Sequence, residues 1–152
     1  MQISPQSLNV PQELWKLLRK TPSDATSVRI GPDAWTLKEI VGHLVDSASN
    51  NHQRFVRLGA GDLRDFPGYD PEVWVAQQKY DGLPWETLLH LWKSYNELLV
   101  HLIAFLPEEA GKNVWHSPDG PLSLEFLVED YYRHMRLHIE HFARRCDEIG
   151  IC

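Results

Sequence analysis

Cysteine is scarce in this chain, which has only Cys146 and Cys152 among its 152 residues. Two cysteines do not make the disulfide framework of a small secreted domain. Long apolar runs are also missing, since no stretch reaches the ~20 consecutive apolar residues that a membrane-spanning helix requires. The first fifteen residues lack a basic segment followed by an apolar one, as a signal peptide would have. We therefore expect a cytoplasmic protein that makes no use of a membrane.

Positive charge is in short supply as well. The chain has 15 Lys and Arg against 21 Asp and Glu, which gives a net charge of −6 at pH 7. Nucleic acids and anionic membranes attract clustered basic side chains, so neither is an expected partner. Hydrophobic residues make up 43% of the chain. A chain of this size can bury a core without disulfides or a structural metal, and we expect residues 1–152 to form one domain.

The spacing of apolar residues predicts helices throughout, and no convincing two-residue alternation indicates a strand. A first helix is expected over about residues 11–20. Thr36 and Glu39 form a capping box that opens a second helix, Pro84 opens a third, and Ser123 caps a last helix that reaches Ile149. The third helix carries one apolar stripe, formed by Leu88, Leu91, Trp92, Tyr95, Leu98, Leu99 and Leu102.

Four long amphipathic helices predict an all-α four-helix bundle. The connection between the second and third helices has ~20 residues or more, whereas 2–8 are usual in bundles. This length allows a crossover that leaves the two helices parallel. A short extra helix is expected within it, capped by Asp70 and beginning at Pro71, with Tyr69 and Trp74 closing the end of the bundle rather than contacting a substrate.

Three of the eight histidines stand in "YYRHMRLHIEH", residues 131–141. At 100° per residue, His138 falls close to the centre of the apolar face of the last helix, and His134 and His141 line one flank of it. On the second helix, His43 flanks the apolar face in the same way. His43, His134 and His138 would converge if the two faces met. The remaining histidines are expected at the surface: His52, His90, His101 and His116.

Two interpretations follow from this spacing alone, a metal site and a structural polar seam that binds water. Burial of unpaired imidazoles costs on the order of 1–3 kcal/mol each, and one divalent ion would satisfy several of them together. The i, i+4 spacing of His134 and His138 brings both rings to one side of a helix, as zinc sites on helices require. The glutamate that follows the first histidine of helical metalloproteases is absent.

Three segments, taken in order, resemble the DinB/YfiT-like superfamily over roughly residues 30–148: "WTLKEIVGHLVDSASNNHQRF" from Trp35, "GYDPEVW" from Gly68, and "YYRHMRLHIEH". The resemblance implies a bundle with up-down-down-up topology and a divalent metal, zinc or nickel, held by His43, His134 and His138. It places His141 beside that site. It also implies a homodimer, and a metal-dependent hydrolase or a thiol-dependent S-transferase that uses a low-molecular-weight thiol.

Asn50, Asp46 and Tyr131 are the candidate catalytic neighbours of such an ion. Asp46 could orient a ligand histidine or act as a base, although its angle of about −60° from His43 fits surface exposure equally. Asn50, at about −20° from His43, projects more nearly in the direction of that histidine. We expect a small-molecule substrate. The alternatives are a metal-binding bundle without turnover and a purely structural bundle that dimerises.

Overall fold

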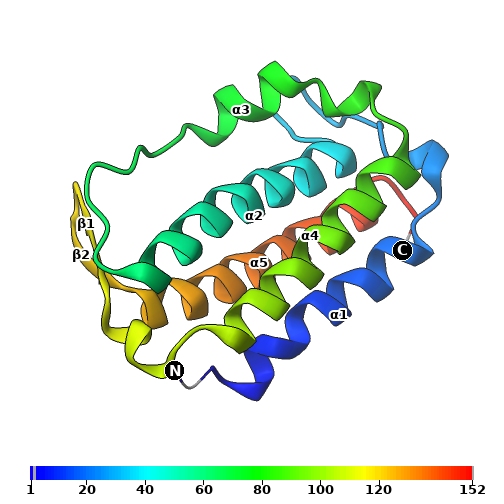
Figure 1. Cartoon of the computed structure of the whole chain (residues 1–152). Helices are drawn as coiled ribbons and strands as arrows, with labels where there is room; N and C mark the ends of the chain where they lie inside the picture. Colours follow the sequence, from blue (N-terminus) through cyan, green and yellow to red (C-terminus); the bar gives the residue numbers. More distant parts are fainter. Residues whose placement is uncertain (2, 152) are drawn as a thin grey trace.

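The computed structural model describes residue 1 and residues 3–151. Following the chain in Figure 1, α2 and α4 run in the same direction while α1 and α5 run in the opposite one, which is the predicted up-down-down-up topology. α2 packs against α4 and α5, and α1 closes the ring by packing against the same two helices. None of the described helices is both long enough and apolar enough to cross a membrane. The long helices are α1 (Pro5–Lys20), α2 (Leu37–Ala60), α4 (Trp85–Phe105) and α5 (Leu124–Glu148).

The predicted starts of α2 and α5 are confirmed by their caps. Thr36 Oγ1 accepts a hydrogen bond from the Glu39 backbone N–H, and the Glu39 carboxylate accepts one from the Thr36 backbone N–H, so that the capping box is complete. Ser123 accepts a hydrogen bond from the Phe126 N–H at the start of α5. These bonds satisfy backbone donors that the first turn of a helix leaves without partners. They therefore fix the two helices that carry the clustered histidines.

The crossover from α2 to α4 carries the expected short helix, α3 (Pro71–Gln78), followed by a 3-10 turn, η2 (Tyr80–Gly82). Asp70 caps α3, as predicted, by accepting hydrogen bonds from two backbone N–H groups. In Figure 1 the crossover returns along α2, so that α3 lies beside that helix. The crossover therefore covers the bundle on the side of α2.

A buried tyrosine holds the crossover against α2. The ring of Tyr80 lies on Gly42, where an added Cβ would stand 2.1 Å from a ring carbon. The Tyr80 hydroxyl donates a hydrogen bond of 2.7 Å to Oδ1 of Asp46, one turn further along α2. Gln78 donates a second hydrogen bond, of 2.5 Å, to the same oxygen. Asp46 thus binds the crossover through two donors.

The first helix begins at Pro5 rather than near residue 11, so the predicted start was wrong. Ser4 caps it by accepting a hydrogen bond from the Ser7 N–H, and Pro5 stands in the first turn, where its missing N–H is not needed. Glu129 of α5 anchors this end, because its carboxylate accepts hydrogen bonds from Ser4 N and Ser7 Oγ. Pro11 lies inside the helix. The anchor comes from α5, which the local sequence does not show.

The expectation of no strands was also wrong, because a small hairpin joins α4 to α5. It follows a 3-10 turn, η3 (Glu108–Lys112), and consists of β1 (Val114–Ser117) and β2 (Gly120–Ser123). Each strand has four residues, too few to show an alternation in the sequence. Gly120 has a φ of 125°, which favours glycine in the tight turn. His116, which was expected at the surface, lies in β1 and is exposed.

The core contains the apolar faces that were predicted for α2 and α5, including Leu44, Phe55, Met135 and Phe142. The predicted stripe of α4 is only partly covered. Leu88, Trp92 and Leu99 are buried, but Leu91 and Leu98 are 45% and 44% exposed. Among the long helices α4 packs mainly against α2 and α1, and it meets α5 through Asn96, which accepts a hydrogen bond from Tyr131, so its core-facing side is narrower than the stripe. We define the outer stripe of α4 as a row of five residues, of which the first, third and last are exposed and the other two are half-buried: Leu91, Tyr95, Leu98, Leu102 and Phe105.

We predict that Gly42→Ala destabilises the protein by about 1–3 kcal/mol, because the new methyl group overlaps the buried Tyr80 ring. This loss opposes the gain of roughly 1 kcal/mol that Ala ordinarily gives over Gly inside a helix. Urea unfolding of the two proteins measures the difference. In a Tyr80→Ala background the same change should become stabilising, since the ring is gone. Destabilisation of equal size in both backgrounds would show that the Tyr80 contact is not the cause.

Candidate metal centre

Three histidines from two helices converge in the seam between α2 and α5. Nε2 of His134 lies 3.2 Å from Nε2 of His43 and 3.1 Å from Nε2 of His138. A ligand nitrogen from each of the three lies within 4.8 Å of the others. His43 is 4% exposed, and the other two are half-buried. The second turn of α2 and one face of α5 thus bring together the three residues that were predicted as metal ligands.

Hydrogen bonds alone do not account for this arrangement. Nε2 of a neutral imidazole carries either one proton or one lone pair, so Nε2 of His134 can make one good hydrogen bond with its two close neighbours, and not two. At least one of the two contacts would therefore lack a well-directed hydrogen bond. A cation at the point where the three nitrogens converge removes this conflict, because each lone pair can point at it.

The spacing of the nitrogens fits a divalent ion. With metal–nitrogen bonds of about 2.0–2.1 Å, ligand nitrogens stand about 3.3–3.4 Å apart at tetrahedral angles and about 2.8–3.0 Å apart at right angles. The two observed separations, 3.1 and 3.2 Å, fall between these values. His134 therefore stands at the distance from each of the other two histidines that shared coordination of one ion requires.

The imidazoles are held in the uncharged form that binds a metal. Burial, followed by the neighbouring His134 and His141, lowers the pKa of His43 to about 4. Burial and the neighbouring histidines lower the pKa of His138 to about 3. Burial also lowers the pKa of His134 and of His141. At neutral pH a cation would therefore meet lone pairs rather than protons.

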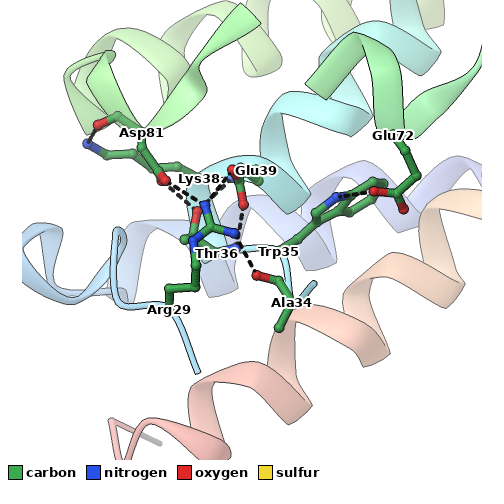
Figure 2. A network of polar contacts seen from close by, with 8 residues as sticks. All are labelled: Arg29, Ala34, Trp35, Thr36, Lys38, Glu39, Glu72 and Asp81. Atoms are coloured by element: carbon green, nitrogen blue, oxygen red, sulfur yellow. Dashed lines mark hydrogen bonds and ion pairs between the residues drawn. The ribbon is translucent and has the colours of Figure 1, made fainter. Parts of the chain in front are cut away.

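An indole ring covers the histidine cluster from the side of the crossover. The Trp35 ring centroid lies 5.0 Å from that of His43 and 6.5 Å from that of His138. Figure 2 shows how Trp35 is held: its Nε1–H donates a hydrogen bond of 3.0 Å to Glu72 Oε2 on α3. The sequence contained a signal for this position, because Trp35 directly precedes the capping residue Thr36, where an apolar side chain often packs back on the helix.

A polar network beside Trp35 ties this segment to the crossover (Figure 2). Arg29 donates hydrogen bonds to Glu39 Oε1 at 2.7 Å and to Asp81 Oδ2 at 2.9 Å. Thr36 Oγ1 donates to the other oxygen of Asp81 at 2.7 Å. The hydroxyl that caps α2 is therefore also bound to η2. Sequence reasoning missed Arg29 and Asp81, which stand 52 positions apart.

The other predicted site residues have different surroundings. His141 lies next to the cluster, with its ring centroid 5.7 Å from that of His138, but it is outside the group of three. Asn50 is buried on α2, two turns after His43. Ser47, which the sequence analysis did not single out as a site residue, has its hydroxyl 3.5 Å from Nδ1 of His134.

Two of the candidate catalytic side chains are engaged elsewhere. Asp46 is buried, and its Oδ1 accepts hydrogen bonds from Tyr80 and Gln78 of the crossover, while burial raises the pKa of its carboxyl. The hydroxyl of Tyr131, also buried, donates a hydrogen bond of 2.6 Å to Asn96 Oδ1 in the core. Burial raises the pKa of Tyr131 well above its usual value. Of the histidines expected at the surface, His90 and His101 are exposed, whereas His52 is half-buried against Tyr95.

Comparison with known proteins places this chain in a family. The model of the DinB superfamily matches residues 8–142, and the chain belongs to this superfamily. A protein of Bacillus cereus strain AH820 named "Putative metal-dependent hydrolase" is 28% identical over 138 residues, which cover 89% of this chain and 78% of that protein.

A second relative, with the same name, comes from Oceanobacillus iheyensis and is 28% identical over 109 residues. The match covers 71% of this chain and 62% of the longer protein. YfiT from Bacillus subtilis, described as a probable metal-dependent hydrolase with an unusual four-helix bundle topology, superposes with a TM-score of 0.83. The superposition covers 99% of this chain and 92% of YfiT at 22% identity, and it shows that the two share a fold.

We predict that the metal-free protein loses stability as the pH falls below about 6.5. Unfolded imidazoles take up protons near that pH, whereas His43 and His138 resist protonation down to about pH 4 and 3 in the folded protein. The unfolded state thus binds more protons in this window, and the free energy of unfolding should fall by up to about 1.4 kcal/mol per pH unit for each of the two imidazoles, less the part that solvent screens. Urea unfolding at a series of pH values measures it.

The variant His138→Leu serves as the comparison for this prediction. It removes one of the two imidazoles whose pKa is strongly lowered, and it places an apolar side chain of similar size in the seam. Its free energy of unfolding should therefore depend less steeply on pH between 6.5 and 4. A profile as steep as that of the wild type would mean that other groups cause the loss.

Proposed function

We propose that this chain is a metal-dependent enzyme, and that His43, His134 and His138 hold a divalent ion, zinc or nickel, through their Nε2 atoms. The observation that carries the proposal is that Nε2 of His134 lies 3.2 Å from Nε2 of His43 and 3.1 Å from Nε2 of His138, while burial lowers the pKa of all three imidazoles. Relatives bearing the name of a metal-dependent hydrolase support it.

The donor set favours catalysis over a purely structural role. Three neutral ligands leave the full double charge of the ion in place, and three protein ligands are typical of sites that keep a position open. An ion bound there acts as a Lewis acid and lowers the pKa of a water or a thiol that enters the open position. A closed structural site would instead require a fourth protein ligand.

A small substrate is the class that fits the surroundings. A groove of about 400 Å³ lies between residues 29–39 and α3, and Trp35 and Glu72 form part of its wall. None of the three histidines lines this groove, and Trp35, which contacts the ring of His43, separates it from the cluster, so we assign it as a substrate-binding surface beside the site. Buried Asn50 and the ring of His141 are the proposed contacts for the reacting group. Asp46 and Tyr131 are left out of this role, because Oδ1 of Asp46 holds the crossover and the Tyr131 hydroxyl binds Asn96 in the core.

Hydrolysis is the reaction that the names of the relatives support, and thiol transfer is the second candidate. The second candidate is favoured by the engagement of Asp46. Its Oδ1 binds two donors of the crossover, whereas its Oδ2 has no hydrogen-bond partner among the described residues, so the carboxylate, for which the role of a base was one alternative, is held against the crossover. An ion held by the three histidines would lower the pKa of a thiol, so that its deprotonation would need less help from a base than that of water. We propose the cytoplasm, where low-molecular-weight thiols are abundant, as its compartment.

We predict that untagged protein binds about one equivalent of Zn²⁺ or Ni²⁺, and that His43→Ala and His138→Ala abolish this binding. The expected loss follows from the removal of one of three ligands. Elemental analysis after dialysis measures the content. His101→Ala, which removes an exposed histidine of α4, is the matched control and should retain the metal. Wild-type protein that takes up neither metal would contradict the proposal.

The two reactions are distinguished by assays of the loaded protein. Esters, amides and electrophiles are offered with and without a low-molecular-weight thiol. Product that forms only with the thiol, and that carries its sulfur, identifies a transferase, whereas product that forms in water alone identifies a hydrolase. A metal-loaded protein without turnover in either assay would favour a non-catalytic metal-binding bundle.

A second copy of this chain is the macromolecular partner that we propose. The outer stripe of α4 follows the 4-3-4-3 spacing with which helices pair. Leu98 lies at its centre, with Leu91 and Phe105 two turns to either side, and Phe105 is 76% exposed. A two-fold axis at Leu98 would pair the stripe with itself in antiparallel order, apolar residue against apolar residue.

We predict that Leu98→Lys converts a dimer into a monomer, because two lysines would meet at the two-fold axis. Sedimentation equilibrium should show the mass falling from twice 17.6 kDa to 17.6 kDa. Leu137→Lys is the matched control, since Leu137 is 58% exposed on α5, away from the stripe, and its replacement should leave the dimer intact. Wild-type protein that is monomeric at tens of micromolar would contradict this assignment.

A further inference from the structure

Two of the three clustered histidines lack the hydrogen bond that ligand histidines ordinarily make through their second nitrogen. Nδ1 of His43 and Nδ1 of His138 are buried without a hydrogen-bond partner in the described part of the chain. Nδ1 of His134 has only Ser47 Oγ, at 3.5 Å. In most metal sites this second nitrogen donates to a carboxylate, a carbonyl or a water, and that bond sets the orientation of the ring. Another contact must set it for His43 and His138.

Trp35 is the side chain that contacts both of these rings from outside the cluster. Its ring lies at 41° to the ring of His43, with the centroids 5.0 Å apart, and at 20° to the ring of His138, with the centroids 6.5 Å apart. Both separations fall within the range in which aromatic rings attract one another. The angle of 20° means that the indole and the ring of His138 are nearly parallel. One indole therefore limits the rotation of two imidazoles that come from different helices.

Trp35 is itself fixed from two sides. Its backbone precedes the capping box of α2, where Thr36 and Glu39 hold each other. Its Nε1–H donates to Glu72 Oε2 at 3.0 Å, and Glu72 stands in the first turn of α3 (Figure 2). The indole can therefore transmit the position of the crossover to the histidine rings.

We propose that Trp35 is a positioning residue for the metal ligands, and that its indole, held by Glu72, takes the place of the missing hydrogen bonds in orienting His43 and His138. This inference rests on the metal site of the proposed function. The terminal torsion of histidine is soft, so a ring without a partner rotates over a broad range. Such a ring must be ordered when the ion binds, and the affinity for the ion is lower as a result.

The test measures Zn²⁺ affinity by competition with a chromophoric chelator, using metal-free full-length protein. Trp35→Ala should weaken binding 10- to 100-fold, the range seen when the groups that orient a ligand are removed. Trp35→Phe keeps a ring against the imidazoles and should stay within a few-fold of the wild type. Circular dichroism and urea unfolding of the metal-free proteins show whether each variant folds.

Glu72 supplies a second test that does not disturb the core, since its side chain is exposed. Glu72→Ala removes the acceptor for the indole N–H and should weaken Zn²⁺ binding several-fold, whereas Glu72→Gln retains an acceptor and should bind as the wild type does. Trp15→Ala is the matched control, because Trp15 also pairs with a histidine ring, that of His90 at 6.4 Å, outside the cluster. Its replacement should leave the affinity unchanged.

The outcomes separate this inference from the proposed function. Equal affinity in the wild type and in a folded Trp35→Ala overturns the role of Trp35 alone, as does an equal loss in Trp35→Phe and Trp35→Ala. If Trp35→Ala does not fold, an unchanged affinity in Glu72→Ala overturns it. Wild-type protein that binds no Zn²⁺ overturns the proposed function and this inference together.

Discussion

The parallel course of α2 and α4 is the constraint on which the rest of the structure depends. Two parallel helices cannot be joined by a short loop, so after α2 the chain must return along the whole bundle. α2 has 24 residues and is therefore about 36 Å long. The returning segment lies along α2 and brings Glu72, Tyr80 and Asp81 to the end of that helix where His43 stands. The topology thus covers the histidine cluster with a second layer of chain.

Much of this fold could be predicted from the sequence because the signals were local. The capping box at Thr36 and the cap at Asp70 each specify backbone geometry within a few residues. The length of the connection follows from where one helix ends and the next begins. The features that were missed depend on distant partners or on very short elements. The start of α1 is held by Glu129, and the strands of the hairpin are too short to show a period. The exposed part of α4 could not be predicted, since it depends on how many helices cover α4.

The site was predictable to the extent that it lies on helices. Helical geometry gave the side on which His43, His134 and His138 project, and the structure brings them together. It could not say what would lie opposite Asp46, three residues after His43. The structure places Tyr80 and Gln78 there, so Asp46 holds the crossover. Trp35 was likewise visible only as the residue before a cap, because its contacts with the rings of His43 and His138 require α2 and α5 to be in place.

With a metal ion on the three imidazoles, as we propose, the second layer would link the order of the crossover to the affinity for the ion. The hydroxyl of Thr36 both caps α2 and donates to Asp81, so release of the crossover would weaken the start of the helix that carries His43. It would also free the indole of Trp35 from Glu72. A ligand that binds only the ordered state stabilises that state in proportion to the logarithm of its concentration over its dissociation constant. An ion on the three imidazoles would therefore stabilise the ordered crossover. The ordered crossover would in turn keep the imidazoles oriented for the ion, because the coupling free energy acts equally in both directions.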